Sequence, residues 1–249
     1  MCCVKWFMGV SVKYMGSKAR IAKHILPIIL KNRKEGQCYV EPFVGGANMI
    51  DKVDGWRIGG EFNRYIAEMW IELASGVKPI TITKNDYAEI KSNPSNYPYW
   101  LVGWVGIACS YSGKWFGGFA GKTVTLGGDR DYQAEAHANL EKQLPSLNGV
   151  EFIHSSYSEL EIPDKSVIYC DPPYAGTTKY KDDFDHELFW QWCREKVKEG
   201  HEVFISEYNA PDDFVCVWSQ EVKSSLSANG KSGGNKLSVE KLFIHKSQA

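Results

Sequence analysis

Residues 167–176, "VIYCDPPYAG", combine the pattern of a buried strand with a rigid turn. Residues 167–169 are β-branched or aromatic, as in strands that are buried on both faces. The apolar run then stops at Asp171, which is followed by two prolines and Tyr174. Because proline fixes its own φ and restricts the residue before it, we expect the Asp171 carboxylate and the next carbonyl to be held rigidly at the strand end.

This corner offers two hydrogen-bond acceptors beside the flat face of Tyr174. Such a set suits a planar amine, for example the exocyclic amino group of a nucleobase, which presents two N–H donors and a ring that can stack. The structural alternative is a turn that ends the strand and in which Tyr174 only packs.

Strand and helix patterns alternate on both sides of this stretch. Before it, "CYVEPFVGGANMI" predicts a strand, a glycine turn and a helix start, and "WRIGGEFN" a strand followed by the helix "RYIAEMWIELAS". After it, "HELFWQWCREKVKEG" predicts an amphipathic helix with Asp185 as N-cap, and "EVFISEY" a strand. Two closing strands are expected at "FVCVWSQEV" and "EKLFIHK". This alternation predicts an open α/β sheet.

The pattern changes between residues 77 and 144. A turn-rich stretch, "NPSNYPYW", precedes a buried helix, "WLVGWVGIACS", a glycine- and aromatic-rich loop or hairpin, "GKWFGGFAGKTVTLGG", and a surface helix, "DYQAEAHANLEKQL". We therefore predict one α/β domain, formed by residues 1–76 and 145–249, with an insert at 77–144.

Composition narrows the class of protein. A hydrophobic content of 43% over 249 residues supports a sizeable core, and a net charge of −1 neither requires nor excludes nucleic acid. The seven cysteines form no Cys-x-x-Cys pair and have no histidine at metal spacing, so reduced thiols in a cytoplasmic protein are expected rather than disulfides or a metal site. No apolar run is long enough for a membrane span.

Two further strand ends carry candidate binding residues, because ligands of open α/β sheets bind outside the carboxyl ends of the strands. Gly45 and Gly46 would let a ligand approach the backbone and the following helix N-terminus, although many strand-to-helix turns use glycine for their shape alone. Glu61 ends the next strand, where a carboxylate can accept from both hydroxyls of a ribose or can simply be a solvated loop acid.

Four stretches together resemble the Dam-type (D12 class) DNA adenine-N6 methyltransferases. "KYMGSKARI", "VEPFVGGANMI", "GEFN" and "DPPY" occur in the order of that family's motifs, and the resemblance extends from about Lys13 to the "EKLF" strand. It implies a Rossmann-like S-adenosylmethionine-dependent methyltransferase sheet with an inserted, mainly helical target-recognition subdomain. It also implies a site-specific enzyme that methylates N6 of a flipped adenine in double-stranded DNA.

The resemblance assigns roles to individual residues. S-adenosyl-L-methionine would be bound by Tyr14, Lys18, Phe43, Gly45, Gly46, Glu61, Tyr157 and Asp171, and catalysis would use Asp171, Pro172 and Tyr174. The chain departs from the family pattern at two positions: Glu61 replaces the usual aspartate, and Ser156, in "HSSYSEL", stands where many members carry an acid.

DNA contacts are expected in the insert, from a set of basic and aromatic residues, Lys114, Trp115, Phe116, Lys122 and Arg130. Trp115 and Phe116 could instead form the core of the insert. The loop from Lys231 to Lys236 is a second candidate for phosphate contacts or a solvated linker. The insert lacks the Arg-x-Asn pattern of GATC-reading members, so the recognised sequence does not carry over.

Other functions remain open at this stage. N4-cytosine methylation of DNA and N6-adenine methylation of RNA need the same acceptor geometry. A nicotinamide-dependent oxidoreductase is a more distant alternative, because "FVGGAN" lacks the third glycine of the dinucleotide motif. A bacterial or phage-encoded enzyme of the host cytoplasm, in a restriction-modification setting or acting alone, fits the resemblance.

Overall fold

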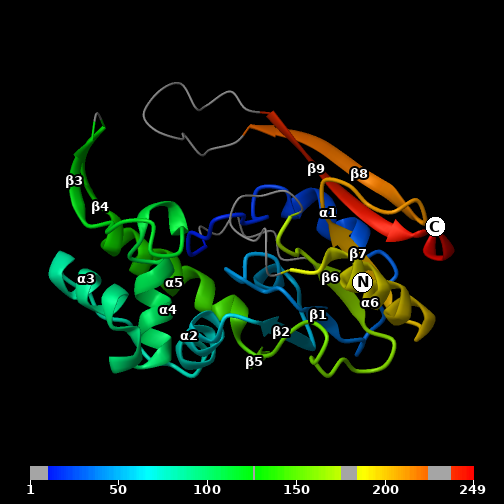
Figure 1. Ribbon diagram of the computed structural model, residues 1–249, viewed down its shortest axis with the longest axis horizontal. Coiled ribbons are helices and arrows are strands. Elements are labelled where there is room, and N and C mark those ends of the chain that lie inside the picture. The colour runs from blue at the N-terminus through cyan, green and yellow to red at the C-terminus, as the bar shows by residue number, and fades with distance from the viewer. Residues whose placement is uncertain (1–10, 126, 175–183, 224–236) are drawn as a thin grey trace. The chain divides into compact units, whose positions relative to one another are not determined.

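The computed structural model describes residues 11–125, 127–174, 184–223 and 237–249 (Figure 1). The chain divides into two compact units, Met1–Glu161 and Ile162–Ala249, which are described separately. In both units parallel strands alternate with helices, which confirms the predicted α/β class and its Rossmann-like, mostly parallel sheet.

The sheet of the first unit contains three parallel strands with β2 in the middle. They are β1 (Tyr39–Glu41), β2 (Arg57–Glu61) and β5 (Val150–His154). Helix α2 (Arg64–Ala74) follows β2, and its N-cap Asn63 accepts a hydrogen bond from the backbone N–H of Tyr65. The strand, turn and helix predicted from "WRIGGEFN" onward are therefore confirmed.

The remaining helices of this unit are α1 (Ala22–Ile29), α3 (Lys84–Ser92), α4 (Tyr99–Ile107) and α5 (Tyr132–Leu147), with 3-10 helices η1 (Ile50–Lys52), η2 (Pro94–Asn96) and η3 (Tyr111–Gly113). The predicted hairpin is present as β3 (Lys122–Thr125) and β4 (Gly128–Asp131). Helix α5 is less superficial than expected, because it buries polar side chains such as Gln143 and Asn139.

The expected helix after the glycine turn does not form. Ala47 has a left-handed φ of 52°, and only the three-residue η1 follows. The carbonyls of Gly46 and Ala47 instead accept hydrogen bonds from the side-chain amide of Gln143 on α5, at 3.2 and 3.1 Å. A buried side chain thus satisfies carbonyls that helical hydrogen bonds would otherwise satisfy.

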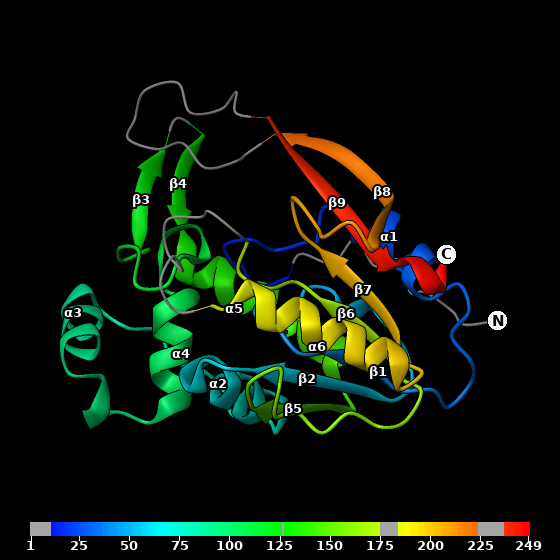
Figure 2. The same cartoon turned by 45° about the vertical axis from the view of Figure 1, so that its right-hand side comes forward.

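The insert packs on the sheet-forming part of the same unit through α2 and α4, which lie side by side (Figures 1 and 2). A Cβ atom on Gly103 would come within 2.1 Å of the Tyr65 carbonyl oxygen, so glycine is needed for this close approach. Sequence analysis missed α3. Its signal is a capping box, in which Thr83 and Asp86 exchange side-chain and backbone hydrogen bonds.

The described residues of the second unit form four strands in the order β6-β7-β9-β8. They are β6 (Val167–Cys170), β7 (Glu202–Ser206), β8 (Phe214–Lys223) and β9 (Leu237–His245), followed by η5 (Lys246–Gln248). Strands β6 and β7 are parallel, whereas β9 is antiparallel to both β7 and β8. Helix α6 (His186–Lys198) connects β6 with β7, and its N-cap is Asp185, as predicted.

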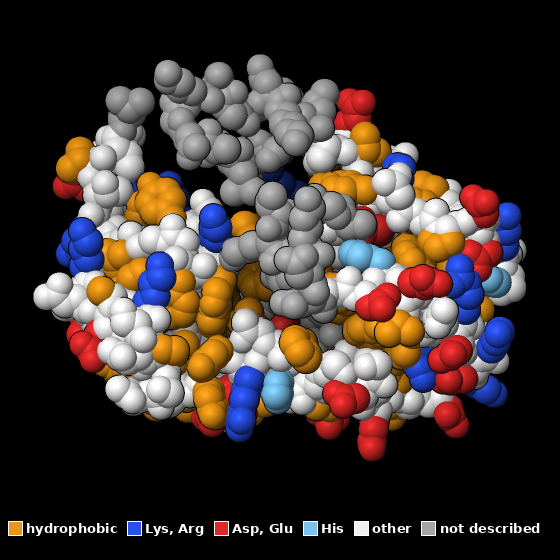
Figure 3. Space-filling model, in the orientation of Figure 1, with side chains coloured by type: hydrophobic (Ala, Val, Ile, Leu, Met, Phe, Trp, Pro, Cys, Tyr) orange, Lys and Arg blue, Asp and Glu red, His pale blue; other side chains and the backbone are white. Residues whose placement is uncertain are grey.

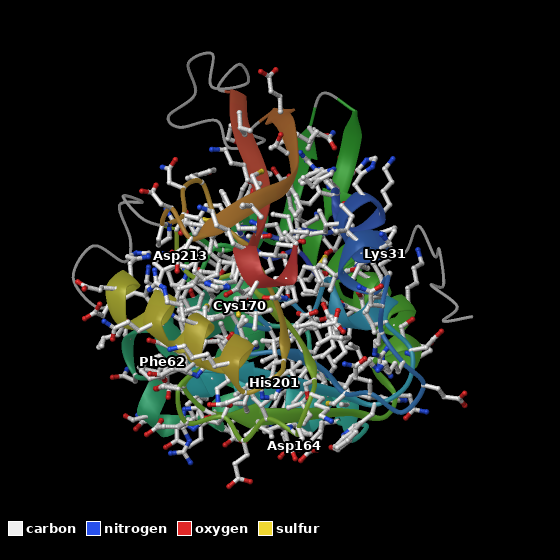
Figure 4. All side chains as sticks on the ribbon, turned by 90° about the vertical axis from the view of Figure 1, so that its right-hand side faces the viewer. Lys31, Phe62, Asp164, Cys170, His201 and Asp213 are labelled. Atoms are coloured by element: carbon white, nitrogen blue, oxygen red, sulfur yellow. The ribbon has the colours of Figure 1, made fainter. Side chains whose placement is uncertain are left out.

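Side chains fix the C-terminal end of α6, where Asp213 and His201 are labelled in Figure 4. Near its C-terminus, Arg194 forms an ion pair with Asp213. Beyond the helix, His201 is buried and its Nδ1 accepts the backbone N–H of Ser166 at 3.0 Å, just before β6. No helix among the described residues has the length and apolar character needed to cross a membrane.

Candidate active-site residues

The glycine turn after β1 is held from two sides. The Gly45 N–H donates a hydrogen bond to Oε2 of Glu61 at 3.0 Å, and the Gly45 carbonyl accepts one from the indole N–H of Trp70 at 2.7 Å. Gly45 itself has a φ of 48°, in the left-handed region that glycine adopts without strain. The turn after β1, the end of β2 and helix α2 are thereby linked through one residue.

Tyr14 packs directly against this turn. A Cβ atom on Gly45 would lie 2.8 Å from Cε1 of Tyr14, and one on Gly46 would lie 2.5 Å from its Cβ. Both glycines are therefore required by the approach of the tyrosine. Three of the residues predicted to bind the cofactor are thus brought together. Lys18, another of them, is buried, and its ammonium group donates to the Gly16 carbonyl at 3.4 Å.

Glu61 is half-buried, and both of its carboxylate oxygens receive backbone donors. Besides the Gly45 N–H, the Asn63 N–H donates to Oε1 at 2.9 Å. Burial raises the pKa of Glu61 above its ordinary value, while the hydrogen bonds from the backbone N–H groups of Asn63, Gly45 and Phe62 lower it. A carboxylate has about four acceptor positions, so these three contacts leave acceptor capacity for a ribose hydroxyl.

Aromatic rings lie near this strand end. Phe43 and Tyr157, both predicted cofactor residues, stack with their ring centroids 5.5 Å apart and an interplanar angle of 28°. Phe62, which directly follows Glu61 and is labelled in Figure 4, is 75% exposed. Sequence analysis did not select it, because the exposure of a single aromatic residue cannot be read from the sequence.

Ser156 occupies a position where many members of the resembled family carry an acid. Sequence analysis overlooked that Glu159 lies beside it. The Ser156 hydroxyl donates to Oε2 of the exposed Glu159 at 2.7 Å, and the Glu159 N–H donates back to the Ser156 oxygen at 3.2 Å. A carboxylate thus lies next to position 156 even though the residue there is serine. The Ser-x-x-Glu spacing is the signal that could have identified it.

In the second unit, the predicted catalytic residues follow β6 directly. Cys170, labelled in Figure 4, is the last residue of this buried strand, and Asp171, Pro172 and Tyr174 come after it. Pro172 is buried, whereas Asp171 and Tyr174 are half-buried. Burial, and then the negative charge of Asp171, raise the pKa of Tyr174 well above its ordinary value, so the phenol stays protonated close to this carboxylate.

Two further residues contact Tyr174. Its hydroxyl donates to Oε2 of Glu240 at 2.9 Å, and its ring meets that of Tyr208 edge-on, with centroids 4.6 Å apart at 81°. Both partners are distant in the sequence, and neither belongs to a motif, so no sequence signal pointed to them.

The aromatic DNA candidates pack against helices of the first unit, both inside the insert and at α2. Trp115 lies over Gly106, where an added Cβ would come within 2.5 Å of its ring, and stacks on Tyr65 with a centroid distance of 5.9 Å. Phe116 contacts the ring of Tyr87, and its N–H donates to the Gly106 carbonyl at 2.8 Å. This packing favours the alternative in which both residues belong to the core of the insert.

The basic candidates are exposed, and two of them are paired. Lys122, which is 86% exposed, lies 3.7 Å from a carboxylate oxygen of Asp131, and Arg130 forms an ion pair with Glu135. Lys114 is also exposed. Figure 3 shows Lys and Arg side chains at separate positions, not in one continuous patch, on the visible face of the region of β3, β4 and α4. The Lys231–Lys236 loop lies outside the described residues.

Within the described parts of the chain, no group of three or more His, Cys, Asp or Glu side chains could hold a metal ion. The expectation of a metal-free protein stays a prediction.

One of the comparisons with known proteins identifies a family, over part of the chain. Residues 14–67 match the model of the D12 class N6 adenine-specific DNA methyltransferase family, which confirms the resemblance over this segment. It contains Tyr14, Lys18, the glycine turn and Glu61. No curated protein matches the chain significantly. A solved structure described as "a putative methyltransferase from Thermoplasma acidophilum" has 10% sequence identity and a TM-score of 0.31, with 88% of this chain and 72% of that chain covered.

Proposed function

We propose that this protein is a site-specific DNA methyltransferase that transfers a methyl group from S-adenosyl-L-methionine to N6 of adenine. The family match over residues 14–67 supports a methyltransferase. The observation that carries the proposal is the arrangement within that segment, where Tyr14 and Glu61 both contact the glycine turn.

The residues of the first unit fit an adenosine-containing cofactor. Glu61 retains acceptor capacity for a ribose hydroxyl, and Phe43 and Tyr157 supply aromatic faces for a purine. The fixed Gly45 peptide keeps the Glu61 carboxylate in one position before any ligand arrives. When bound, S-adenosylmethionine would supply an electrophilic methyl group on its sulfonium.

The second unit supplies acceptors for the amine. The lone pair of an adenine amino group is delocalised into the ring, so the nitrogen is a poor nucleophile. If the Asp171 carboxylate and the Pro172 carbonyl each accept one N–H, they favour a pyramidal nitrogen and stabilise its developing positive charge. Tyr174 would stack on the base and set its plane. Asp171 acts here as an electrostatic acceptor, since a methylated cationic amine loses its proton readily.

Lys114, Lys122 and Arg130 are proposed to contact DNA phosphates, since all three are exposed or part-exposed cations of the insert. Trp115 and Phe116 are proposed to support the loop that carries Lys114, because they pack on α4 and α3.

Expression in a methylation-free bacterial host, followed by long-read sequencing, tests the proposal. We expect N6-methyladenine at one sequence motif with the wild-type protein and none with Asp171→Ala. Thermal unfolding of the purified variant should match that of the wild type, because Asp171 is only half-buried. N4-methylcytosine in the DNA, or methylation confined to RNA, would replace the proposed substrate. Retained methylation in Asp171→Ala would remove the acceptor role.

A further inference from the structure

Two contacts in the second unit constrain different motions of the Tyr174 side chain. The hydrogen bond from its hydroxyl to Oε2 of Glu240, at 2.9 Å, fixes the direction of the ring axis. The edge contact with Tyr208, at 4.6 Å and 81°, limits rotation of the ring about that axis. Together they determine the plane that the Tyr174 ring presents.

One partner, Tyr208, follows β7, which pairs with β6, and the other, Glu240, belongs to β9, which pairs with β7. Tyr208 follows β7, and its backbone N–H donates to Oε1 of Glu207 at 2.7 Å, a side chain that is only 2% exposed. A buried carboxylate thus restrains the backbone at the point where the Tyr208 side chain begins.

The register of β9 explains how Glu240 reaches the tyrosine. Ser206, the last residue of β7, pairs with Leu242 of β9, and because the strands are antiparallel, Glu240 lies beyond the carboxyl end of β7. Side chains two residues apart in a strand share a face, so Glu240 lies on the face of the fully buried Leu242. This is the end of the sheet at which Asp171 follows the parallel strand β6.

The charges around Tyr174 keep it a hydrogen-bond donor. Burial raises the pKa of its phenol, and the negative charges of Asp171 and Glu240 raise it further. The hydroxyl is thus neutral near pH 7 and can donate to Glu240.

We propose that Glu240 is a positioning residue which, together with Tyr208, sets the plane of the Tyr174 ring against a planar base whose amino group binds at Asp171. This inference rests on the proposed function for its substrate. Glu240 would not touch the base itself but would act through the tyrosine. A stacked base fixes the amine relative to its acceptors, and small misplacements of reacting groups lower turnover strongly.

A double-mutant cycle on methyl transfer tests this inference. Glu240→Leu and Tyr174→Phe should each lower kcat about tenfold, because a misplacement of about 1 Å can cost up to a hundredfold. The double variant should be no worse than either single variant, since both changes remove the same hydrogen bond. Glu240→Gln retains an acceptor oxygen and should restore most of the turnover. Affinity for S-adenosylmethionine, measured by calorimetry, should change little in all of them.

Glu221→Leu serves as the matched control, because Glu221 is an exposed carboxylate of the adjacent strand β8 that pairs with Val239 and not with Glu240. It should leave kcat unchanged. Multiplicative effects of Glu240→Leu and Tyr174→Phe would mean independent roles and would overturn the inference. Wild-type turnover in Glu240→Leu would do the same.

A second measurement needs no substrate and separates this inference from the proposed function. With 3-fluorotyrosine incorporated at position 174 alone, the fluorine NMR signal should shift or broaden in Glu240→Leu but not in Glu221→Leu. An unchanged signal would show that Glu240 does not position the ring, whatever reaction the protein catalyses. Absence of methyl transfer by the wild-type protein, by contrast, would contradict the proposed function alone.

Discussion

The glycine turn at residues 45–47 and the β3–β4 hairpin both place carboxylates beside hydrogen-bond donors, but the donors differ. At the turn, the half-buried Glu61 accepts from backbone N–H groups. At the hairpin and the start of α5, Asp131 and Glu135 face the side chains of Lys122, Arg130 and Lys13 near the surface. One region thus holds its charge with fixed donors, and the other with long side chains in contact with solvent.

This difference suits two kinds of ligand. Backbone donors cannot rotate away, so the turn keeps one geometry before a ligand binds, as a site for a small cofactor requires. Exposed ion pairs contribute only about 0–1 kcal/mol each and are screened by salt, so cations at the hairpin can exchange their partners for phosphates. We therefore expect small steric changes at the glycine turn to abolish its function. Changes of charge at the hairpin should alter its binding of phosphates only gradually.

The strongest way to break the turn is Gly46→Ala. The new methyl group would lie 2.5 Å from Cβ of Tyr14 and 2.7 Å from Nδ2 of Asn48, so both neighbours must move. We expect a loss of about 1–3 kcal/mol in the free energy of unfolding, as for other overpacked sites, together with weaker binding of S-adenosylmethionine. Urea unfolding and calorimetry measure the two effects.

The matched control is Gly127→Ala in the hairpin. A Cβ atom there would meet only Oγ1 of Thr125, at an ordinary contact distance of 3.8 Å. Its free energy of unfolding should stay within about 0.5 kcal/mol of the wild type, as for most surface substitutions. Equal losses from the two alanine substitutions would mean that the turn is no more tightly packed than the hairpin.

Glu61→Gln tests the electrostatic side of the same comparison. Because the pKa of Glu61 is raised in the folded protein, the folded state holds this proton more tightly than the unfolded state does. The stability of the wild type relative to Glu61→Gln should therefore fall as pH rises from the ordinary glutamate value of 4.5 to the raised value. The slope can be at most about 1.4 kcal/mol per pH unit. Urea unfolding of both proteins across this range measures it, and a pH-independent difference would contradict the raised pKa.

The sequence predicted those features of the turn that depend on nearby residues. Strand β1, the two glycines and the acid at the end of β2 follow from local patterns and from motif order. The absent helix after the turn could not be predicted, because Gln143 of α5, almost a hundred residues away, satisfies the Gly46 and Ala47 carbonyls. Long-range side-chain contacts of this kind leave no periodic signal in the sequence.

The same limit applies to the proposed catalytic residues. The strand and rigid corner at Asp171 were readable from proline chemistry and the buried run before them, whereas Glu240 and Tyr208 become neighbours of Tyr174 only through the pairing of β7 with β9. By contrast, α3 was missed even though Thr83 and Asp86 carried a local signal.

The mildest test addresses the charge balance near the hairpin. Glu135 accepts from Lys13 at 2.9 Å and from Arg130, so Glu135→Gln should free two cations for phosphate contacts. We expect severalfold tighter DNA binding at low salt, and a plot of log affinity against log salt that steepens by about 1 to 2, since each added phosphate contact contributes about 0.9.

The matched control is Glu141→Gln. Glu141 is an exposed acid on the same helix, so this change removes an equal charge without freeing a paired cation and should leave the slope nearly unchanged. Fluorescence anisotropy over a salt series measures both variants. Identical slopes for the two would mean that the ion pairs of Glu135 do not restrain the cations and that this surface does not bind the DNA backbone.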